Sequence, residues 1–242
     1  MILSDINVRK ALAYAVPREE IVKDIFLGHA EVADTPINPN SWLKNTTKNV
    51  YVCNTDLAKS LLTQNGWADT DNDGILEKNG EKLSFVMLIN SENEHRLAAA
   101  ESIKESFKKI GVELKLDVQS YEAYTHKLYE KDFEMVYAGW KLSTVPDLTF
   151  AFHSSQIESG SNFISYRSSE MDNLLQQAFS STQESSTAEA FLKIQNLITE
   201  DLPYISLYFR NTAVLADGKI HGEISSNVDN LYIGIENWYI HE

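Results

Sequence analysis

An α/β fold with a largely parallel central sheet is the architecture that this sequence predicts. Residues 82–140 alternate between strand and helix patterns, in the order strand, helix, strand, helix, strand. Parallel strands need crossover helices of this kind, and those helices then cover the faces of the sheet. Amphipathic helices before and after this unit supply further cover for a hydrophobic core.

Composition limits the function more than it limits the fold. The chain has 242 residues, of which 43% are hydrophobic, and a net charge of −14. This charge argues against a nucleic-acid or anionic-membrane partner, because binding phosphate needs clustered Lys and Arg. Cys53 is the only cysteine, so no intramolecular disulfide is possible. No apolar stretch approaches the roughly 18 residues that a membrane-spanning helix needs.

Three helices are predicted in the first quarter of the chain. Ser4 or Asp5 can cap a helix whose apolar residues follow at helical spacing. Pro17 ends that helix and suits the first position of a second one, for which Gly28 is a C-terminal cap. Residues 55–65 predict a third helix with one apolar face.

The predicted sheet occupies the middle of the chain. Residues 82–90 predict a strand whose centre, 85–89, is apolar on both faces, which is typical of a central strand. Residues 92–110 show the clearest helical stripe, and Gly111 ends it. Residues 112–118 alternate apolar and charged, which predicts a strand with one solvated face, and 121–130 predict a short helix.

The remaining segments predict less regular structure. Residues 29–50 contain several turn formers and predict a long ordered loop. Two further helices are expected around 171–179 and 191–198, followed by an apolar strand over 204–209. A further apolar run follows over 213–216, and the last 25 residues, 218–242, lose periodicity, which predicts loops and short strands.

The third predicted strand, over 133–140, ends in an unusual way. It reaches Gly139-Trp140 and opens into a short polar segment that Pro146-Asp147 closes. A strand that delivers a tryptophan and then stops places an aromatic ring and free backbone groups at the edge of a sheet. That arrangement favours ligand capture, and the alternative is a core tryptophan at a strand end.

A set of motifs follows one another in a characteristic order along most of the chain. They are Asp5-x-x-Val8-Arg9-x-Ala11-Leu12-x-Tyr14-Ala15, Ala58-Lys59-x-Leu61-Leu62 with Gly66-Trp67, Asp71-x-Asp73-Gly74-Ile75, Gly139-Trp140 with His153-Ser154-Ser155, and Leu202-Pro203-Tyr204. In this order and spacing they resemble the bacterial extracellular solute-binding proteins of the oligopeptide, dipeptide and nickel class (family 5), which feed ABC importers.

The resemblance implies the C-terminal lobe of a periplasmic-binding-protein-like fold of type II, peptide-binding class. In such a lobe helices flank a central, mostly parallel sheet. Residues 1–210 would form the lobe, and residues 211–242 would return toward an N-terminal lobe. The chain is therefore expected to be a fragment that lacks the first lobe, the signal peptide and any lipid-anchor cysteine.

The implied function is that of the substrate-binding component of a peptide ABC importer. It would bind extended oligopeptides in a cleft between two lobes, without chemistry and without a cofactor. The implied partners are an oligopeptide, an ABC permease and the missing N-terminal lobe. The implied location is extracellular or periplasmic, with the full-length protein anchored to the membrane as a lipoprotein.

The resemblance also implies which residues contact the ligand. These are Gly139, Trp140, Lys141, Leu142, Ser143, Asp147, Asn162 and Tyr166. Ser143 stands where many relatives carry an Asp for the ligand's α-amino group, and a neutral hydroxyl is a weaker partner for an ammonium. Asp147 can replace that charge or can cap a short helix. Lys141 can meet a carboxylate or can simply be exposed.

A possible metal motif precedes the central strand. Residues 69–74 read Asp-x-Asp-x-Asp-Gly, which copies the first half of an EF-hand loop. Position twelve of that loop, where a bidentate Glu is needed, is Gly80, and Glu77 at position nine does not repair the loss. The sequence therefore predicts a polar turn and no metal ligand, and it leaves calcium open.

Other classes of function are less well supported. His153 lies beside Ser154-Ser155, but no Gly-x-Ser-x-Gly elbow exists, so we expect no enzyme. Binding of a nickel chelate, haem or an oligosaccharide stays open within the same family. A ligand-sensing or protein-interaction module of a regulator is the alternative from another class.

Overall fold

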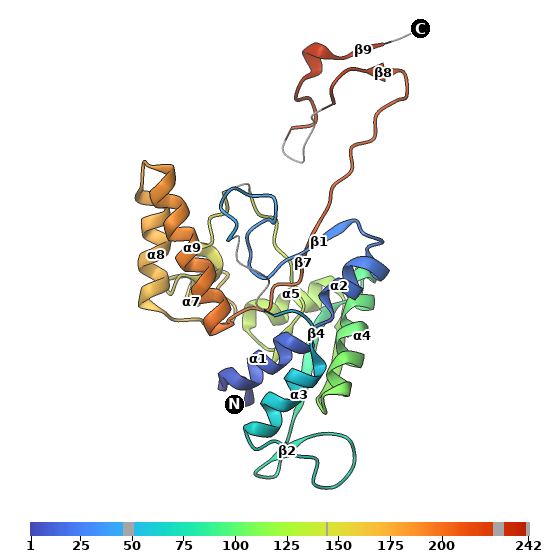
Figure 1. The fold of residues 1–242 in the computed structure, drawn as a ribbon, viewed down its shortest axis with the longest axis vertical. Helices are drawn as coiled ribbons and strands as arrows, with labels where there is room; N and C mark the ends of the chain where they lie inside the picture. The colour runs from blue at the N-terminus through green and yellow to red at the C-terminus, as the bar shows by residue number, and fades with distance from the viewer. Residues whose placement is uncertain (46–50, 144, 225–229, 241–242) are drawn as a thin grey trace.

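The computed structural model describes residues 1–45, 51–143, 145–224 and 230–240. Its centre is a parallel sheet with the strand order β5–β4–β6, and two crossover helices connect these strands (Figure 1). In chain order these elements are β4 (Ser84–Asn90), α4 (Glu94–Lys109), β5 (Glu113–Gln119), α5 (Tyr121–Glu130) and β6 (Met135–Val136). The predicted α/β class and the predicted order of strands and helices are both confirmed.

The central strand β4 is buried from both sides, as its apolar sequence predicts. Met87 and Ile89 belong to the main hydrophobic core, which α4 covers. Leu88 points the other way and packs against Tyr124 and Leu128 of α5. Because side chains alternate across a strand, this apolar run supplies both layers of the core.

The N-terminal helices extend the layer that α4 forms. The α1 helix (Ile6–Ala15) begins at Asp5, whose carboxylate accepts a hydrogen bond from the Asn7 N–H at 2.9 Å. The second helix begins as a short α-helix, α2 (Arg18–Glu20), and continues directly as a five-residue π-helix, η2 (Ile21–Ile25). The third, α3 (Thr55–Gln64), packs against α1 and shares the main core.

A second core lies beside the sheet. Its helices are α6 (Thr149–Phe152), α8 (Ser169–Ser180) and α9 (Glu184–Asp201), and the short α7 (Gln156–Ser159) packs next to α6. Figure 1 shows α8 and α9 as an antiparallel pair, and Phe152 and Phe191 are almost completely buried between these elements. The sequence predicted both long helices, although α9 begins earlier than the residues 191–198 around which it was expected.

Two predicted strands are much shorter than expected. The strand predicted over 133–140 is paired with β4 only at Met135–Val136. The strand predicted over 204–209 is reduced to β7 (Tyr208–Arg210). It pairs antiparallel with β1 (Ala30–Val32), inside the region predicted as a loop. β1 forms because it pairs with a strand that lies far away in the sequence, so no local sequence pattern predicts it.

The C-terminal segment leaves the body of the molecule in Figure 1. It carries the short elements β8 (Ile220–His221), η3 (Ile235–Asn237) and β9 (Tyr239–Ile240), in agreement with the predicted loops and short strands. The other short elements are η1 (Ile2–Ser4) and the hairpin of β2 (Glu77–Lys78) and β3 (Glu81–Lys82). None of the helices in the described residues is long and apolar enough to span a membrane.

Candidate ligand-binding site

The carboxyl ends of β4, β5 and β6 meet at one edge of the sheet. In open α/β sheets this is the edge at which ligands bind. The N-termini of α4 and α5 lie there too, because each helix starts within a few residues of the strand before it. We call residues 137–143, which continue from β6 across this edge, the edge segment.

The backbone of the edge segment is largely unpaired. Its first residue is still tied to the sheet, since the Tyr137 N–H donates to the Leu88 carbonyl at 2.9 Å. The N–H and C=O groups of residues 138–142 then make no hydrogen bond to any described residue. Three of these five residues are exposed and two are half-buried. Free backbone groups at the edge of a sheet can pair with the backbone of an extended peptide.

Trp140 is supported from behind and open in front. Its ring stacks nearly parallel to Phe163, with centroids 5.7 Å apart, and meets Phe150 edge-on at 4.8 Å. Phe163 is buried, whereas Trp140 keeps 39% of its surface exposed. The side chain is therefore not a core tryptophan, and it offers a fixed aromatic surface to a ligand.

Arg96 is a site residue that the sequence analysis missed. A Cβ built on Gly139 would lie 2.7 Å from Nη2 of Arg96, so the guanidinium rests directly against the edge segment. Nη1 donates to the amide oxygen of Asn90 at 3.1 Å. No Asp or Glu among the described residues lies within ion-pair distance of Arg96. This half-buried cation can accept a carboxylate or carbonyl group from a ligand.

The sequence contains one signal from which Arg96 could have been predicted as a site residue. It lies in the first turn of α4, after the capping residue Asn93, whose side chain accepts from the Arg96 N–H. Cations are disfavoured at this end of a helix, because the macrodipole is positive there. An arginine in the first turn behind a central strand therefore indicates a requirement other than helix stability.

The buried tyrosines beneath the edge fix its position. The Tyr124 hydroxyl donates to the Tyr137 carbonyl at 3.1 Å, and the Tyr137 hydroxyl reaches that of Tyr208 at 3.0 Å. Burial and the neighbouring Tyr208 raise the pKa of Tyr137, and the charge of Arg96 opposes that rise. Tyr137 is thus a neutral hydrogen-bonding link between β6 and β7.

The two candidates for an α-amino partner are engaged locally. The Ser143 hydroxyl donates to the Val145 carbonyl at 2.7 Å. Asp147 accepts from the Thr149 N–H at 2.9 Å in the turn ahead of α6, whose N-cap position is held by Leu148. Both side chains are exposed, as is that of Lys141. Their contact with a ligand stays a prediction.

Asn162 serves the protein itself, which corrects its assignment as a ligand contact, whereas Tyr166 is half-buried and its contact with a ligand stays a prediction. Asn162 is completely buried, and its amide bonds to the His153 carbonyl and to both backbone groups of Tyr166. The Tyr166 hydroxyl donates to Asp201 at 2.6 Å. Because Asn162 has no accessible surface, it can shape the turn after Phe163 but cannot touch a ligand. Leu142 is likewise half-buried against the second core.

The serine beside His153 has a different partner from the one that hydrolysis needs. Both the N–H and the hydroxyl of Ser154 donate to Asp172. The Nδ1 atom of His153 accepts from the Ser155 N–H at 3.1 Å. This arrangement does not form a nucleophile–base pair.

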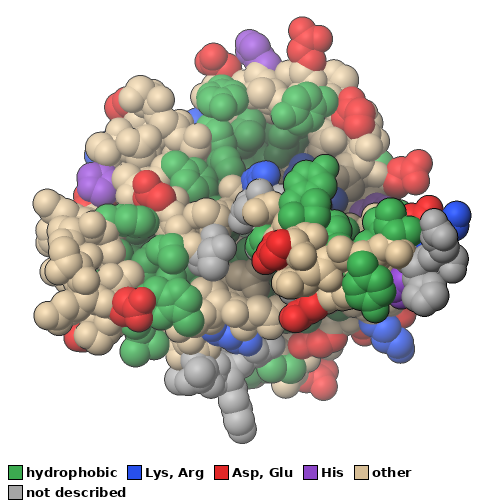
Figure 2. Space-filling model, turned by 90° about the horizontal axis from the view of Figure 1, so that it is seen from above, with side chains coloured by type: hydrophobic (Ala, Val, Ile, Leu, Met, Phe, Trp, Pro, Cys, Tyr) green, Lys and Arg blue, Asp and Glu red, His purple; other side chains and the backbone are tan. Residues whose placement is uncertain are grey.

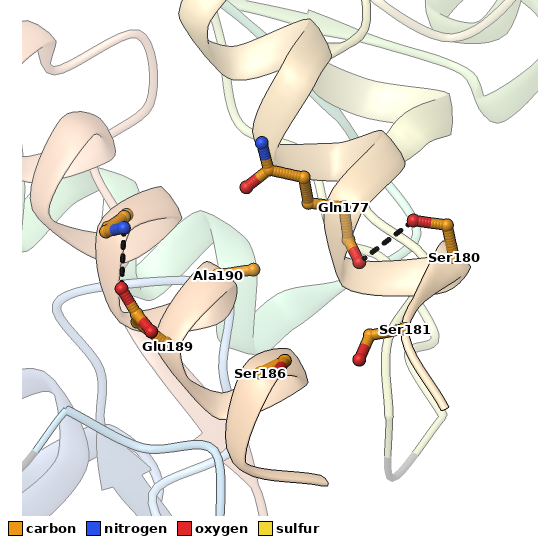
Figure 3. A pocket seen from close by; sticks show the side chains of 7 residues that line it. Gln177, Ser180, Ser181, Ser186, Glu189 and Ala190 are labelled. Carbon is orange, nitrogen blue, oxygen red and sulfur yellow. Dashed lines mark hydrogen bonds and ion pairs between the residues drawn. The ribbon is translucent and has the colours of Figure 1, made fainter. Parts of the chain in front are cut away.

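The hollow of about 230 Å³ between α8 and α9 does not compete with the edge (Figure 3). Its lining residues are Gln177, Ser180, Ser181, Ser186, Glu189, Ala190 and Lys193. The two charged residues among them pair with each other at 2.7 Å, so the hollow offers a ligand no unpaired charge.

Comparison with known proteins decides the family. Residues 1–161 match the model of the bacterial extracellular solute-binding proteins, family 5, middle region. This chain belongs to that family. The resemblance predicted from the sequence motifs is confirmed, as is the lobe architecture.

Several relatives show how much of a family member this chain represents. It is 36% identical to the oligopeptide-binding protein AppA of Bacillus subtilis, over 99% of this chain and 45% of AppA. The solved structure of AppA in complex with a nonapeptide matches 98% of the chain with a TM-score of 0.82. NikZ of Campylobacter jejuni, solved with Ni(L-His), matches 98% of the chain at 25% identity with a TM-score of 0.81. The chain thus spans about half the length of these family members.

Proposed function

We propose that this chain is one lobe of the substrate-binding component of a peptide ABC importer. The observation that carries the proposal is the edge segment, where unpaired backbone lies beside the half-exposed ring of Trp140 and the guanidinium of Arg96. An extended peptide needs these three features: backbone partners, an aromatic surface and a cation for its carboxylate or carbonyl oxygens.

The relatives support a peptide as the ligand. AppA, the relative at 36% identity, is named as an oligopeptide-binding protein, and its solved structure contains a nonapeptide. Binding by this chain would use hydrogen bonds and stacking, and no covalent step. The α-amino group of a peptide would find a weaker partner here than in many relatives, because Ser143 stands in place of an Asp and Asp147 is engaged in a turn.

The other half of the site would come from the rest of a full-length protein. The ligand would lie between two lobes that close over it, and the permease would recognise the closed form. In this proposal residues 1–210 form the lobe, and 211–242 return toward the other lobe. The apolar side chains exposed in that segment, among them Tyr232 and Ile235, would then be covered.

The surface is compatible with such a partner lobe. Figure 2 shows several groups of hydrophobic side chains on the face seen from above, with acidic side chains toward its rim. The family is extracellular by its description. We propose that the full-length protein works outside the cytoplasmic membrane, held there by a lipid anchor.

A calorimetric titration with a mixed peptide pool tests the function. We expect the full-length protein to bind with micromolar or tighter affinity, and this chain alone to bind far more weakly, because it presents half of the contacts. A peptide ligand would be refuted if the full-length protein bound no peptide but did bind a nickel chelate, haem or a sugar. Tight peptide binding by the chain alone would refute the two-lobe site.

Arg96 provides a sharper prediction about the chemistry of the ligand. We expect Arg96→Met in the full-length protein to weaken peptide binding by about 10- to 100-fold, since a hydrogen bond to a charged group contributes about 1.5–3 kcal/mol. Gly139→Ala should weaken binding less, because its methyl group would push the guanidinium aside without removing it.

The control for this prediction is Lys104→Met. Lys104 is exposed on the same helix and pairs with Glu101 at 2.9 Å, away from the edge segment. Its loss should leave peptide affinity unchanged, because surface ion pairs contribute little. If Arg96→Met and the unmodified protein bound peptide with equal affinity, Arg96 would not belong to the binding site.

A further inference from the structure

The acidic turn before β4 brings four carboxylates together. Oxygen atoms of Asp69, Asp71, Asp73 and Glu77 all lie within 4.8 Å of one another. Each aspartate uses one carboxylate oxygen within the turn. Asp69 accepts from the Gly74 N–H, Asp71 from the Asp73 N–H and Asp73 from the Ile75 N–H, at 2.8–3.1 Å. The other oxygen of each aspartate is left over from the turn. Such a turn forms without a metal ion, so the geometry of the aspartates alone decides nothing.

Glu77 supplies an independent observation. Its side chain is only 9% exposed, although its three acidic neighbours are on the surface. Its Oε2 atom accepts from the N–H and hydroxyl of Thr70, at 2.9 and 3.1 Å. Its Oε1 atom is buried and has no hydrogen-bond partner among the residues that the structure describes. A buried carboxylate oxygen without a partner is costly, so this atom indicates a missing cation.

The backbone holds Glu77 in this position. Glu77 lies at the start of β2 and exchanges two backbone hydrogen bonds with Ala68, at 2.8 and 3.0 Å. The carboxylate is therefore delivered to the acidic turn by a paired strand, not by a flexible loop. This arrangement explains why counting along an EF-hand loop failed: position twelve is Gly80, but the hairpin brings position nine into the cluster instead.

Lys82 is the cation now nearest to the cluster. Its ammonium contacts Asp73 and lies 3.1 Å from Asp71, but it is 3.9 Å from Oε1 of Glu77, beyond hydrogen-bond distance. One ammonium faces four carboxylates, and the side chain of Lys82 is 43% exposed. It can leave the cluster at little cost, because exposed ion pairs contribute little.

We infer that Asp69, Asp71, Asp73 and Glu77 bind a calcium ion. Calcium takes six to eight oxygen ligands in flexible geometry, which a mixture of exposed aspartates and one fixed glutamate can supply with water. Magnesium demands a near-ideal octahedron and retains its water, so it suits this cluster less well.

The ion would stabilise the fold and would not touch the ligand. The turn lies at the amino end of β4, whereas the edge segment lies at the carboxyl ends of the strands (Figure 1). Leu76, next to Glu77, donates to the Gly111 carbonyl and accepts from the Leu83 N–H, just ahead of β4. Calcium would therefore fasten the hairpin against the central strand.

Calorimetric titration of the EDTA-treated and desalted full-length protein with calcium chloride tests this site. We expect saturable binding with an affinity on the order of 0.1–1 mM, as in extracellular calcium modules. Glu77→Gln should weaken that binding by about tenfold or more, because the amide can keep the Thr70 contacts but loses the charge. Glu81→Gln, an exposed neighbour in the same hairpin, should bind as the unmodified protein does.

A second variant separates calcium from Lys82 as the resident cation. Lys82→Met should bind calcium more tightly, since a competing ammonium is removed. The absence of saturable calcium binding, equal binding by Glu77→Gln, or loss of binding in Lys82→Met would each overturn the site. Equal saturation by magnesium chloride would overturn calcium as its ion. Circular dichroism in EDTA should show that Glu77→Gln folds, and peptide affinity should not depend on EDTA.

Discussion

Replacing Trp140 with alanine is expected to weaken peptide binding by the full-length protein by about 30-fold, since a tryptophan at the centre of an interface contributes about 2 kcal/mol or more. The ring is held against Phe163 and Phe150, so it loses little conformational freedom when a ligand stacks on it. Calorimetry with one defined peptide measures this change. Trp140→Phe should recover much of the loss, because it keeps an aromatic surface.

Two controls protect this result from a trivial explanation. Phe179→Ala removes a comparably exposed aromatic ring (48%) from α8, outside the edge, and should leave affinity unchanged. Thermal unfolding of Trp140→Ala shows whether the variant is still folded when binding is measured. A folded Trp140→Ala variant with undiminished affinity would show that the ring does not contact the ligand.

The parts of the fold that could be predicted are those with local patterns. An apolar stripe along residues 94–109 predicts α4, and an apolar run within residues 84–90 predicts β4. The pairing of Ala30–Val32 with Tyr208–Arg210 could not be predicted, since Ala30–Val32 has no pattern of its own and its partner lies far away in the sequence. β6 is also short: β4 continues to Asn90, but the described part of the chain after Tyr137 makes no further backbone hydrogen bonds to it.

The candidate site was predictable where the backbone determines it. Gly139-Trp140 at a strand end gave both the aromatic surface and the unpaired backbone. Arg96 was missed because only the packing of α4 against the edge segment brings it there. Asn162 was misassigned because it lies close to Trp140 in the sequence. Its side-chain amide instead makes hydrogen bonds to the backbone of His153 and Tyr166 and stabilises the turn between them. Proximity in sequence could not distinguish contact with a ligand from support of the site.

Arg18 is expected to be the side chain whose loss costs the fold most. It is 3% exposed, and its guanidinium donates to the carbonyls of Ser206, Ala13 and Tyr51 at 2.8–3.0 Å. These carbonyls come from three distant parts of the chain, so one side chain ties them together. Burial lowers the pKa of Arg18, and the nearby Asp34 opposes that shift. The buried charge is therefore retained by its neighbours.

Arg18→Met should lower the free energy of unfolding of this chain by about 3–5 kcal/mol, the usual cost of breaking a buried charged network by removing one partner. The methionine fills part of the space, but it leaves three carbonyls unpaired. Burial raises the pKa of Asp34, and the variant removes the Arg18 charge that opposes this rise. Urea denaturation monitored by circular dichroism measures the change.

Arg167→Met is the matched control for Arg18. Its side chain is 67% exposed and lies 3.7 Å from Glu158, so its loss should cost less than about 1 kcal/mol. Arg18→Lys should recover little stability, because an ammonium cannot reproduce the planar fork that spans the three carbonyls. If Arg18→Met were as stable as Arg167→Met, the three carbonyls would have to find other partners, and Arg18 would not be what joins α1 to the C-terminal part of the lobe.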